Sequence, residues 1–521
     1  MSRLFRVAAP DFLSYGINVR TMIMKKKTAD AFTEYTEALP EEEREALKEF
    51  FSDFDLRCSL PKSGKRRLRK DFEDALLFYA RAGVPFGEAL RRIRPSKLGA
   101  FYSRPPVLWY ALEDSAKIYP LSMKHGEMAV FRLSVYLKEA VVPELLQLAL
   151  DFVIKRFPGF AVSLKKGFFW HYLDTAKRRF AAEAESGVPC SPIRLSRSGS
   201  PAFRVLWYGK RISVEFFHVL TDGTGGVEFL KALTGEYLKL LGVSFPTGED
   251  IFDVDSEPRA SEYENAFSKV KNDPKSSGFV DKSATQMSGK LSKVKPAAVI
   301  HFKMDADSLK AAAKQKGATV TVYMLQRMFL ASKAATESMD GELSIQVPVN
   351  MRKFYPTDTL RNFSLYCWVR IPLKKIEDGP SLIDEIKKQL DERASEKSMR
   401  KMLTMAKTLV SSVRYIPLFI KQPVASAIYG FLGDKIFSNT ISNLGVVTFP
   451  KEIAEHVESM DFLLGTASSN RAECTLVTTG GIATFTVTKN TKDPTFEEKM
   501  YELLEKDGIR IEAEGSGYYE Y

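Results

Sequence analysis

A histidine and an aspartate four residues apart, followed at once by a glycine, are the residues of this chain best suited to chemistry. His218, Asp222 and Gly223 lie in the segment RISVEFFHVLTDGTGGVEFLKALTGEY, Arg211 to Tyr237. An imidazole has an ordinary pKa of about 6.5, so at neutral pH it is mostly a free base that can accept a proton from a hydroxyl, amine or thiol. The spacing supports two interpretations equally: a general base, or a histidine at a strand end with a turn aspartate.

The elements on either side of the motif predict how His218 is positioned. Apolar residues alternate with polar ones before it, which is typical of a half-buried strand, and recur at helical spacing after it; the strand set is Ile212, Val214 and Phe216, and the helix set is Val227, Phe229, Leu230 and Leu233. A strand therefore delivers His218 into a turn, and Gly223 lets the backbone turn there and leaves space for a ligand. Asp222 is better suited to pairing with a cation that fixes this loop than to carrying protons.

The rest of the chain divides into four regions that differ in composition and in expected secondary structure. Residues 1–104 are predicted to form a basic helical extension, residues 105–245 a first α/β lobe, residues 246–296 a polar linker or mobile loop, and residues 297–521 a second α/β lobe. Within the extension, the basic run KSGKRRLRK (Lys62–Lys70) is interpreted as a solvated linker between two helices. No recognition motif for nucleic acid accompanies it, so no nucleic-acid partner is expected.

Composition excludes several classes of protein. The chain has 521 residues and a net charge of +11, with 36 Phe and 20 Tyr available for a large core. No apolar run approaches the roughly 18 residues of a membrane span, and the first residues lack the apolar core of a secretory signal. The four cysteines show no CxxC pairing. We therefore expect a cytoplasmic protein with reduced, mostly buried thiols, no metal site and no membrane span.

One apolar stretch in the second lobe admits two interpretations. Residues 404–432 are strongly apolar but contain Pro417 and Pro423, and Lys407, Arg414 and Lys421 interrupt them. Buried helices that line a channel fit this pattern better than membrane insertion, and binding to a membrane surface is the alternative.

Three segments in order carry a resemblance to a known group of proteins. They are FFHVLTDGTGGVEFLKAL (Phe216–Leu233), VPVNMRKFYPTDTLRNF (Val347–Phe363) and ISNLGVV (Ile441–Val447), preceded by RPPVLWYALEDSAKIYPLS (Arg104–Ser122). From about Pro105 onward the chain resembles the chloramphenicol-acetyltransferase-like superfamily, and most closely its bacterial alcohol acetyltransferase-like family. The ordered segments favour the general-base interpretation of the histidine.

The resemblance implies a fold and a set of roles. The fold class is α/β (α+β in two layers), with two lobes, a channel between them and the HxxxDG motif at its middle. His218 is then the catalytic base and Asp222 its structural partner, with Gly223 beside the substrate. Two polar pairs are further candidates for substrate binding. Ser442 and Asn443 would hold an oxyanion or merely close a strand turn. Asn350 and Arg352, together with Arg361 and Asn362, would line the channel or supply the cation for Asp222.

The resemblance also implies the partners. Acyl-CoA, in the first place acetyl-CoA, is expected as a co-substrate with no tightly bound cofactor, and a small alcohol or amine as the acceptor. Departures from the group weaken a peptide-synthetase relationship: Phe217 stands where condensation domains usually have a second histidine, the BAHD signature DFGWG is absent, and no carrier domain is fused. Two alternatives remain, a condensation enzyme that takes its acyl group from a carrier-protein thioester, and a non-catalytic scaffold with a vestigial site.

Overall fold

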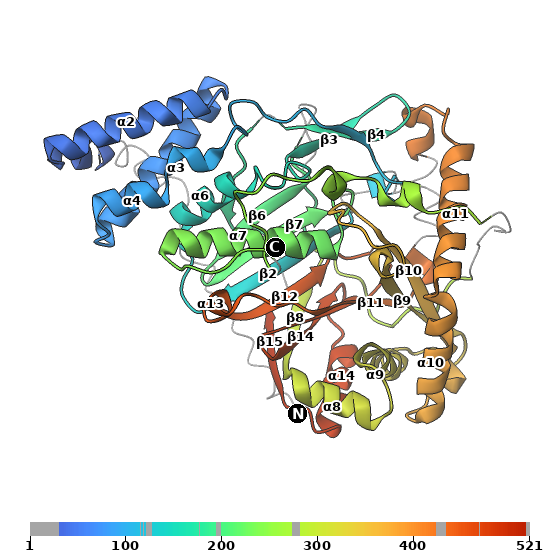
Figure 1. Ribbon diagram of the computed structural model, residues 1–521. Helices are drawn as coiled ribbons and strands as arrows, with labels where there is room; N and C mark the ends of the chain where they lie inside the picture. Colours follow the sequence, from blue (N-terminus) through green and yellow to red (C-terminus); the bar gives the residue numbers. More distant parts are fainter. Residues whose placement is uncertain are drawn as a thin grey trace.

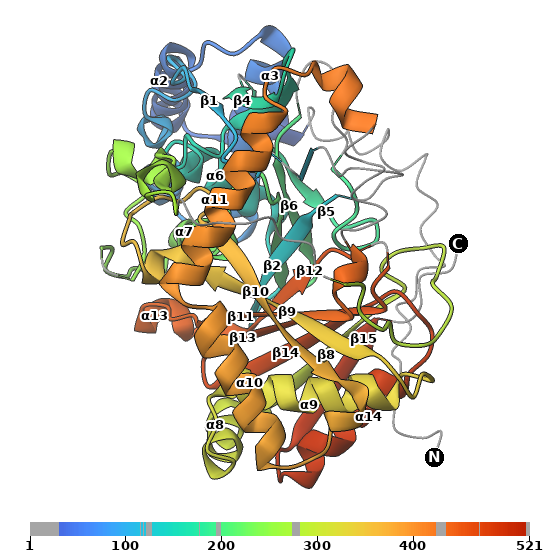
Figure 2. The same ribbon diagram turned by 90° about the vertical axis from the view of Figure 1, so that its right-hand side faces the viewer.

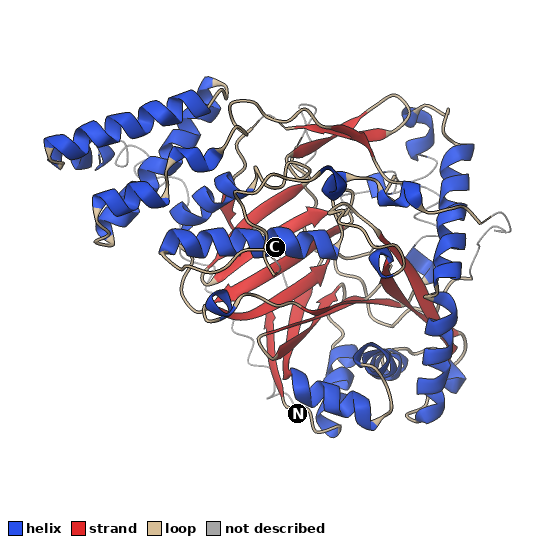
Figure 3. Ribbon diagram, in the orientation of Figure 1, coloured by secondary structure: helices blue, strands red, loops and turns tan. Residues whose placement is uncertain are grey.

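The computed structural model describes residues 31–114, 116–117, 119–120, 128–176, 178–193, 200–248, 250–273, 282–423, 434–467 and 469–516. Within these ranges, strands form the middle of the molecule and helices cover its outer faces (Figures 1 and 3). The strands form a five-stranded sheet in the N-terminal lobe, a seven-stranded sheet in the C-terminal lobe, and a small three-stranded sheet.

The five-stranded sheet has the order β12-β2-β7-β6-β5. Its strands are β2 (Val130–Leu137), β5 (Ala182–Ala184), β6 (Phe203–Tyr208), β7 (Arg211–Phe217) and β12 (Val457–Leu464). Two apolar helices, α6 (Pro143–Val153) and α7 (Gly223–Leu241), cover one face (Figure 1). The alternating residues of β7 pack against them, and the rings of Phe216 and Phe229 lie 6.0 Å apart. The predicted strand, turn and helix around His218 are therefore confirmed.

The seven-stranded sheet has the order β10-β9-β11-β13-β14-β8-β15. Its strands are β8 (Ala298–Asp305), β9 (Glu342–Asn350), β10 (Ser364–Pro372), β11 (Asn439–Val446), β13 (Ala472–Thr479), β14 (Ile482–Lys489) and β15 (Ile511–Ser516). The helices of this lobe are α8 (Ala306–Gln315), α9 (Val320–Ala334), α10 (Pro380–Arg393), α11 (Glu396–Ser412) and α14 (Thr495–Lys506), whereas α13 (Lys451–Ala454) packs with β12 in the N-terminal lobe. In Figure 2, α8, α9, α10 and α14 lie together below this sheet. The hairpin predicted across Gly480 and Gly481 joins β13 to β14.

One strand of the C-terminal half belongs to the other lobe. β12 pairs antiparallel with β2, and its inward side chains Met460 and Phe462 lie in the N-terminal core. The ring of Phe462 is 6.2 Å from that of Phe131. The sequence pattern predicted this strand but not its partner, because alternation of apolar residues indicates a buried face and carries no information about which neighbour completes it.

The N-terminal helices pack directly on the first lobe. They are α2 (Glu41–Arg57), α3 (Lys62–Arg81) and α4 (Phe86–Arg92), at the upper left of Figure 1. The hydroxyl of Tyr79 donates to the carbonyl of Leu240 at 2.7 Å, and Lys97 pairs with Glu236 at 2.5 Å. The interpretation of Lys62–Lys70 as a linker is wrong, because these residues form the first half of α3, where two basic side chains pair one turn onward with Glu73 and Asp74.

The polar connection between the lobes is packed in its described part. Glu262 is fully buried, and both of its carboxylate oxygens accept from Arg156, at 2.6 and 2.8 Å. Phe267 lies in the core of the C-terminal lobe. The polar composition of this segment therefore reflects ion pairs as well as exposure, and residues 274–281 lie outside the described residues.

The apolar stretch 404–432 departs from the prediction. Met399, Leu403 and Val410 of α11 are buried, and so is Leu418, but the turn after α11 and the helical residues 418–423 that follow it expose other large apolar side chains, with Tyr415 at 73% and Phe419 at 72%. The expectation of buried helices is therefore wrong for the exposed positions between 404 and 423. Apolar composition gave no information about which side of the turn faces inward, and residues 424–433 lie outside the described part.

A few further properties follow from the described residues. All four cysteines are buried and form no disulfide, as expected. In the part of the chain that the structure describes, every helix is too short or too polar to cross a membrane. The same residues contain no cluster of three or more His, Cys, Asp or Glu side chains arranged to hold a metal ion.

Candidate active site

His218 lies at the end of β7, where the strand passes into the loop before α7. Its backbone N–H donates to the carbonyl of Ala129 at 2.8 Å, so the neighbouring strand holds the position of the backbone. Two aromatic rings hold the imidazole. Tyr119 stacks on it at a centroid distance of 5.1 Å, with planes 23° apart, and Phe131 approaches edge-on at 5.3 Å. The imidazole is therefore oriented by packing on two sides.

The two ring nitrogens of His218 differ in their surroundings. Nδ1 is buried and has no hydrogen-bond partner among the described residues, whereas the side chain as a whole is partly exposed. Nε2 is consequently the nitrogen accessible to a reactant. Burial lowers the pKa of His218 below its ordinary value, while the charge of Asp222 and the polar backbone of His218 itself act in the opposite direction. The neutral, basic form of the ring is thus favoured at neutral pH.

Asp222 is directed away from the imidazole and into the junction of the two lobes. Its Oδ1 accepts from the backbone N–H of Gly225 at 3.2 Å and caps α7. Its Oδ2 accepts from Arg352 at 2.7 Å and from the backbone N–H of Phe363 at 2.7 Å. Since Arg352 and Phe363 belong to the C-terminal lobe, one carboxylate ties the loop carrying His218 to the opposite lobe.

Arg352 is the cation that the sequence left unassigned. Its guanidinium also donates to the carbonyls of Thr359, at 2.7 Å, and Arg361, at 2.9 Å. These two carbonyls and the carboxylate of Asp222 together fix the orientation of the guanidinium. Asn350 receives the backbone N–H of Arg352 at 3.0 Å and donates to the hydroxyl of Thr224 on α7 at 3.1 Å. Asn350 and Arg352 therefore join the lobes at the first turn of α7.

Arg361 has a different carboxylate partner. It forms an ion pair with Glu113 and lies 4.3 Å over the ring of Tyr110. Burial raises the pKa of Glu113 to about 6, although Arg361 beside it opposes this shift. Asn362 receives the backbone N–H of Ser364 at 3.2 Å. Of the four polar residues between positions 350 and 362, Arg352 is thus the one that pairs with Asp222.

The glycines after Asp222 permit close approach of the two lobes. A Cβ atom on Gly225 would lie 2.2 Å from the carbonyl oxygen of Leu360, and one on Gly223 would lie 2.5 Å from Cδ2 of Leu444. At Gly223 the opposite lobe contributes the side chain of Leu444, so the missing side chain serves packing, and the ligand-binding role of this glycine stays a prediction.

Ser442 and Asn443 lie on β11 and face opposite sides. The amide of Asn443 donates to the hydroxyl of Thr321 on α9 at 3.1 Å, and its oxygen accepts from Gly445 at 2.8 Å. Leu444, which contacts Gly223, lies in the part of β11 where the register with β13 shifts between Asn443 and Val446, whereas Ser442 pairs regularly with Thr475. The side chain of Asn443 is exposed and bonded to Thr321, and Ser442 is nearly buried.

Sequence analysis missed the aromatic and acidic residues around the motif. Tyr119 and Glu113 lie in the segment 104–122, which contributed to the resemblance, but no spacing rule relates them to His218 or Arg361. Phe131 lies on the strand adjacent to β7, and its register with Phe216 was not predictable from either strand alone. These contacts depend on the tertiary arrangement of segments that lie apart in the sequence.

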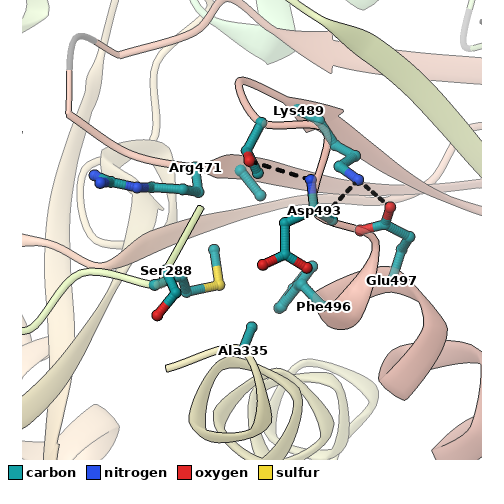
Figure 4. Close-up of a pocket in the computed structure, with 10 residues that line it drawn as sticks. Ser288, Ala335, Arg471, Lys489, Asp493, Phe496 and Glu497 are labelled. Atoms are coloured by element: carbon teal, nitrogen blue, oxygen red, sulfur yellow. Dashed lines mark hydrogen bonds and ion pairs between the residues drawn. The ribbon is translucent and has the colours of Figure 1, made fainter. Parts of the chain in front are cut away.

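A small pocket elsewhere in the C-terminal lobe has no part in this arrangement. Figure 4 shows its lining residues, which include Ser288, Arg471, Asp493 and Phe496. Its main charged contact is a buried ion pair of Lys489 with Glu497, and Lys489 also donates to the carbonyl of Asp493 at 2.8 Å. None of the predicted site residues lines this pocket.

Comparison with known proteins places the fold. No family model matches the chain, and no curated protein matches its sequence. Among solved structures, F. graminearum TRI101 complexed with ethyl coenzyme A is similar with a TM-score of 0.52 at 9% identity, over 79% of this chain and 100% of that one. F. sporotrichioides TRI101 complexed with coenzyme A and T-2 has a TM-score of 0.51 at 12% identity, over 79% and 100%. Polyketide synthase associated protein 5 from Mycobacterium tuberculosis has a TM-score of 0.50 at 11% identity, over 75% and 96%.

The chain has the two-lobed chloramphenicol-acetyltransferase-like fold. This similarity confirms the predicted fold class. At these identities the likeness concerns the fold, and the chemistry of the site has to be argued from the residues of this chain.

Proposed function

We propose that this protein is an acyltransferase that moves an acyl group, in the first place acetyl, from a coenzyme A thioester to the hydroxyl of a small acceptor. The observation that carries the proposal is His218. Its imidazole is held by two aromatic rings, its buried nitrogen has no polar partner among the described residues, and burial lowers its pKa. A fixed, neutral imidazole with one accessible nitrogen is suited to general-base catalysis.

The proposed reaction needs no acyl-enzyme. Nε2 of His218 takes the proton of the acceptor hydroxyl while the hydroxyl oxygen attacks the thioester carbonyl and forms a tetrahedral oxyanion. Collapse of this intermediate breaks the carbon–sulfur bond. The thiolate of coenzyme A leaves and takes the proton from the imidazolium, which returns His218 to its neutral form. The products are an ester and free coenzyme A.

Asp222 acts in this scheme as a positioning residue. Both of its oxygens are occupied by the helix cap, Arg352 and Phe363. A carboxylate committed in this way is unsuited to accept a proton during turnover, and it fixes the loop that carries His218. Ser442 is the proposed donor to the oxyanion, since it is nearly buried on the strand whose Leu444 contacts Gly223, while the amide of Asn443 is bonded to Thr321.

The similar structures support the choice of donor. TRI101 structures of this fold hold coenzyme A or ethyl coenzyme A, and two of them also hold T-2. By analogy, we propose acyl-CoA as a co-substrate of this chain and a small molecule as its acceptor.

Release of free thiol from acetyl-CoA, measured with a panel of alcohols and amines, tests the proposal. We expect the parent protein to release thiol and form an ester, and His218→Ala to lower kcat by about 10²–10⁴-fold. His456→Ala is the matched control, because His456 is a partly exposed histidine immediately before β12 whose backbone bonds to Lys138 and Ile453, and we expect it to keep the parental rate.

Two outcomes would overturn this assignment. A His218→Ala protein as fast as the parent would remove the general base. A parent that ignores acyl-CoA but consumes a carrier-protein thioester would replace the donor and support the condensation-enzyme alternative.

A further inference from the structure

Exposed aromatic and aliphatic side chains from two segments far apart in the sequence gather on the surface. The segments are the loop of the hairpin formed by β3 (Val162–Lys166) and β4 (His171–Thr175), and residues 413–420, which form the turn after α11 and the start of the helical segment that follows it. Phe168 is 67% exposed, Tyr415 73% and Phe419 72%. We call the following six exposed residues the tip cluster: Phe168, Phe169, Tyr415, Ile416, Phe419 and Ile420.

The two segments are bonded into one unit. The backbone N–H of Leu418 donates to the carbonyl of Phe168 at 2.8 Å, and the rings of Phe169 and Tyr415 lie 6.4 Å apart. Nζ of Lys421 lies 3.2 Å from the ring centroid of Trp170. Figure 1 shows the β3–β4 hairpin reaching toward the upper end of α11. The cluster therefore has a defined shape, and the core of the protein leaves it uncovered.

Basic residues outnumber acidic ones in the segments that carry the tip cluster. From residue 397 to residue 433 the sequence contains no Asp or Glu and six basic residues, Lys397, Arg400, Lys401, Lys407, Arg414 and Lys421. Two further lysines, Lys165 and Lys166, immediately precede the hairpin loop. The nearby carboxylates of Asp174 and Asp114 are each paired with a lysine, at 2.7 and 2.6 Å.

The exposed cations next to the tip are available to a partner. Lys166 and Arg414 are exposed and form no ion pair with any described carboxylate. The guanidinium of Arg414 lies 4.6 Å over the ring of Tyr415, which places a positive charge next to an exposed aromatic group. Exposed apolar side chains with neighbouring cations complement a partner that has a hydrophobic interior and a negatively charged surface.

We propose that the tip cluster docks on the surface of an anionic lipid bilayer. The apolar residues enter the boundary between headgroups and acyl chains, and Lys166 and Arg414 contact anionic headgroups. The side chains belong to the ends of a hairpin and of a helix, a protruding shape that a soft lipid surface accepts without a matching pocket. This binding is independent of the proposed acyl transfer, and either one can be absent without the other.

Sedimentation with lipid vesicles tests the proposal on the full chain. The probes are vesicles of phosphatidylcholine alone and of phosphatidylcholine mixed with phosphatidylglycerol. We expect the parent to sediment with the mixed vesicles and about tenfold less with the neutral ones, and we expect added salt to weaken this binding by screening.

Three variants separate the contributions. Phe168→Ser/Phe419→Ser removes apolar groups from both segments, and we expect about tenfold weaker binding to mixed vesicles. Leu56→Ser/Met339→Ser is the matched control, because these side chains are 79% and 81% exposed but lie elsewhere, and it should bind as the parent does. Lys166→Glu/Arg414→Glu should remove the preference for anionic vesicles. All of the changed side chains are exposed, so the thermal unfolding midpoint should stay at the parental value.

Several results would overturn the proposal. They are a parent that fails to sediment with mixed vesicles, or a Phe168→Ser/Phe419→Ser variant that binds them as the parent does. Concentration-dependent dimerisation abolished by that same variant, without vesicle binding, would instead identify the cluster as a contact between two copies of the chain. Saturable binding of an acidic carrier protein in the absence of vesicle binding would identify a protein partner.

Discussion

Two buried charged clusters of this protein differ in what they leave unpaired. In the pocket of Figure 4, Lys489 pairs with Glu497 and donates to a carbonyl, but Oε2 of Glu497 is buried without a hydrogen-bond partner among the described residues. At the junction of the lobes both oxygens of Asp222 are bonded, and the atom without a partner is Nδ1 of His218 beside the ion pair. In the first cluster the unpartnered atom belongs to the ion pair itself, whereas in the second it belongs to a neighbouring imidazole, a group that can accept and release a proton near neutral pH.

Removing Arg352 should give the largest effect, because it acts on both framework and chemistry. Arg352→Met leaves the carboxylate of Asp222 buried without its cation, and we expect the free energy of unfolding to fall by about 3–5 kcal/mol. Misplacement of the His218 loop should lower kcat by about 10²-fold in the protein that remains folded. Urea denaturation and steady-state kinetics measure the two losses. Parental kcat in Arg352→Met would contradict the role of this pair in holding the loop.

The pocket of Figure 4 provides the contrasting case. Lys489→Met leaves Glu497 buried and unpaired, and should also lower the free energy of unfolding by about 3–5 kcal/mol. Because no site residue lines this pocket, kcat should stay at the parental value below the unfolding transition. The double variant Lys489→Met/Glu497→Leu should regain most of the stability. A large fall in kcat for the folded single variant would break the comparison.

Substitutions of two neighbouring residues on β11 test which side chain stabilises the oxyanion. Ser442→Ala should lower kcat by about 10²-fold if its hydroxyl stabilises the oxyanion, with little change in KM for the donor. Asn443→Ala is the matched control, since its amide is bonded to Thr321 on the far side of β11. Equal rates for Ser442→Ala and the parent would leave the oxyanion to other donors.

The pH dependence should give the smallest effect. The base acts in its neutral form, and burial lowers the pKa of His218, so kcat/KM should fall only at pH values below the ordinary midpoint of about 6.5. At pH 6.0 an ordinary imidazole is about one quarter neutral, and this enzyme should retain a larger fraction of its plateau rate. Asp222→Asn removes the charge that raises this pKa and should shift the midpoint lower still. A midpoint above 6.5 in the parent would contradict the geometry around the ring.

The sequence predicted local elements better than their partners. The strand, turn and helix around His218 follow from alternation and helical spacing, and the ordered segments indicated the fold class. The sequence limited the ion-pair partner of Asp222 to the polar cluster from Asn350 to Asn362 but did not identify which residue it is. The identity depends on how β9 and β10 (residues 342–372) meet α7 across the lobes. The stacking of Tyr119 on His218 depends on a contact between residues about a hundred positions apart.

Surface placement was the other property that the sequence left open. Lys62–Lys70 has the composition of a linker, yet its i,i+4 ion pairs stabilise a helix. Residues 404–432 have the composition of a core, yet the segment after α11 exposes Tyr415 and Phe419. In both cases composition was a poor guide, because helix formation and burial depend on the neighbours of each segment.

The crossing of β12 has a consequence for how the chain can be divided. The N-terminal sheet obtains its outer strand from residues 457–464, so a fragment ending in the connection between the lobes would expose the edge of β2 and the apolar side chains that Phe462 covers. The C-terminal fragment would carry β12 without a sheet to join. Each half therefore depends on the other for part of its packing, and we expect neither half to fold as an independent domain.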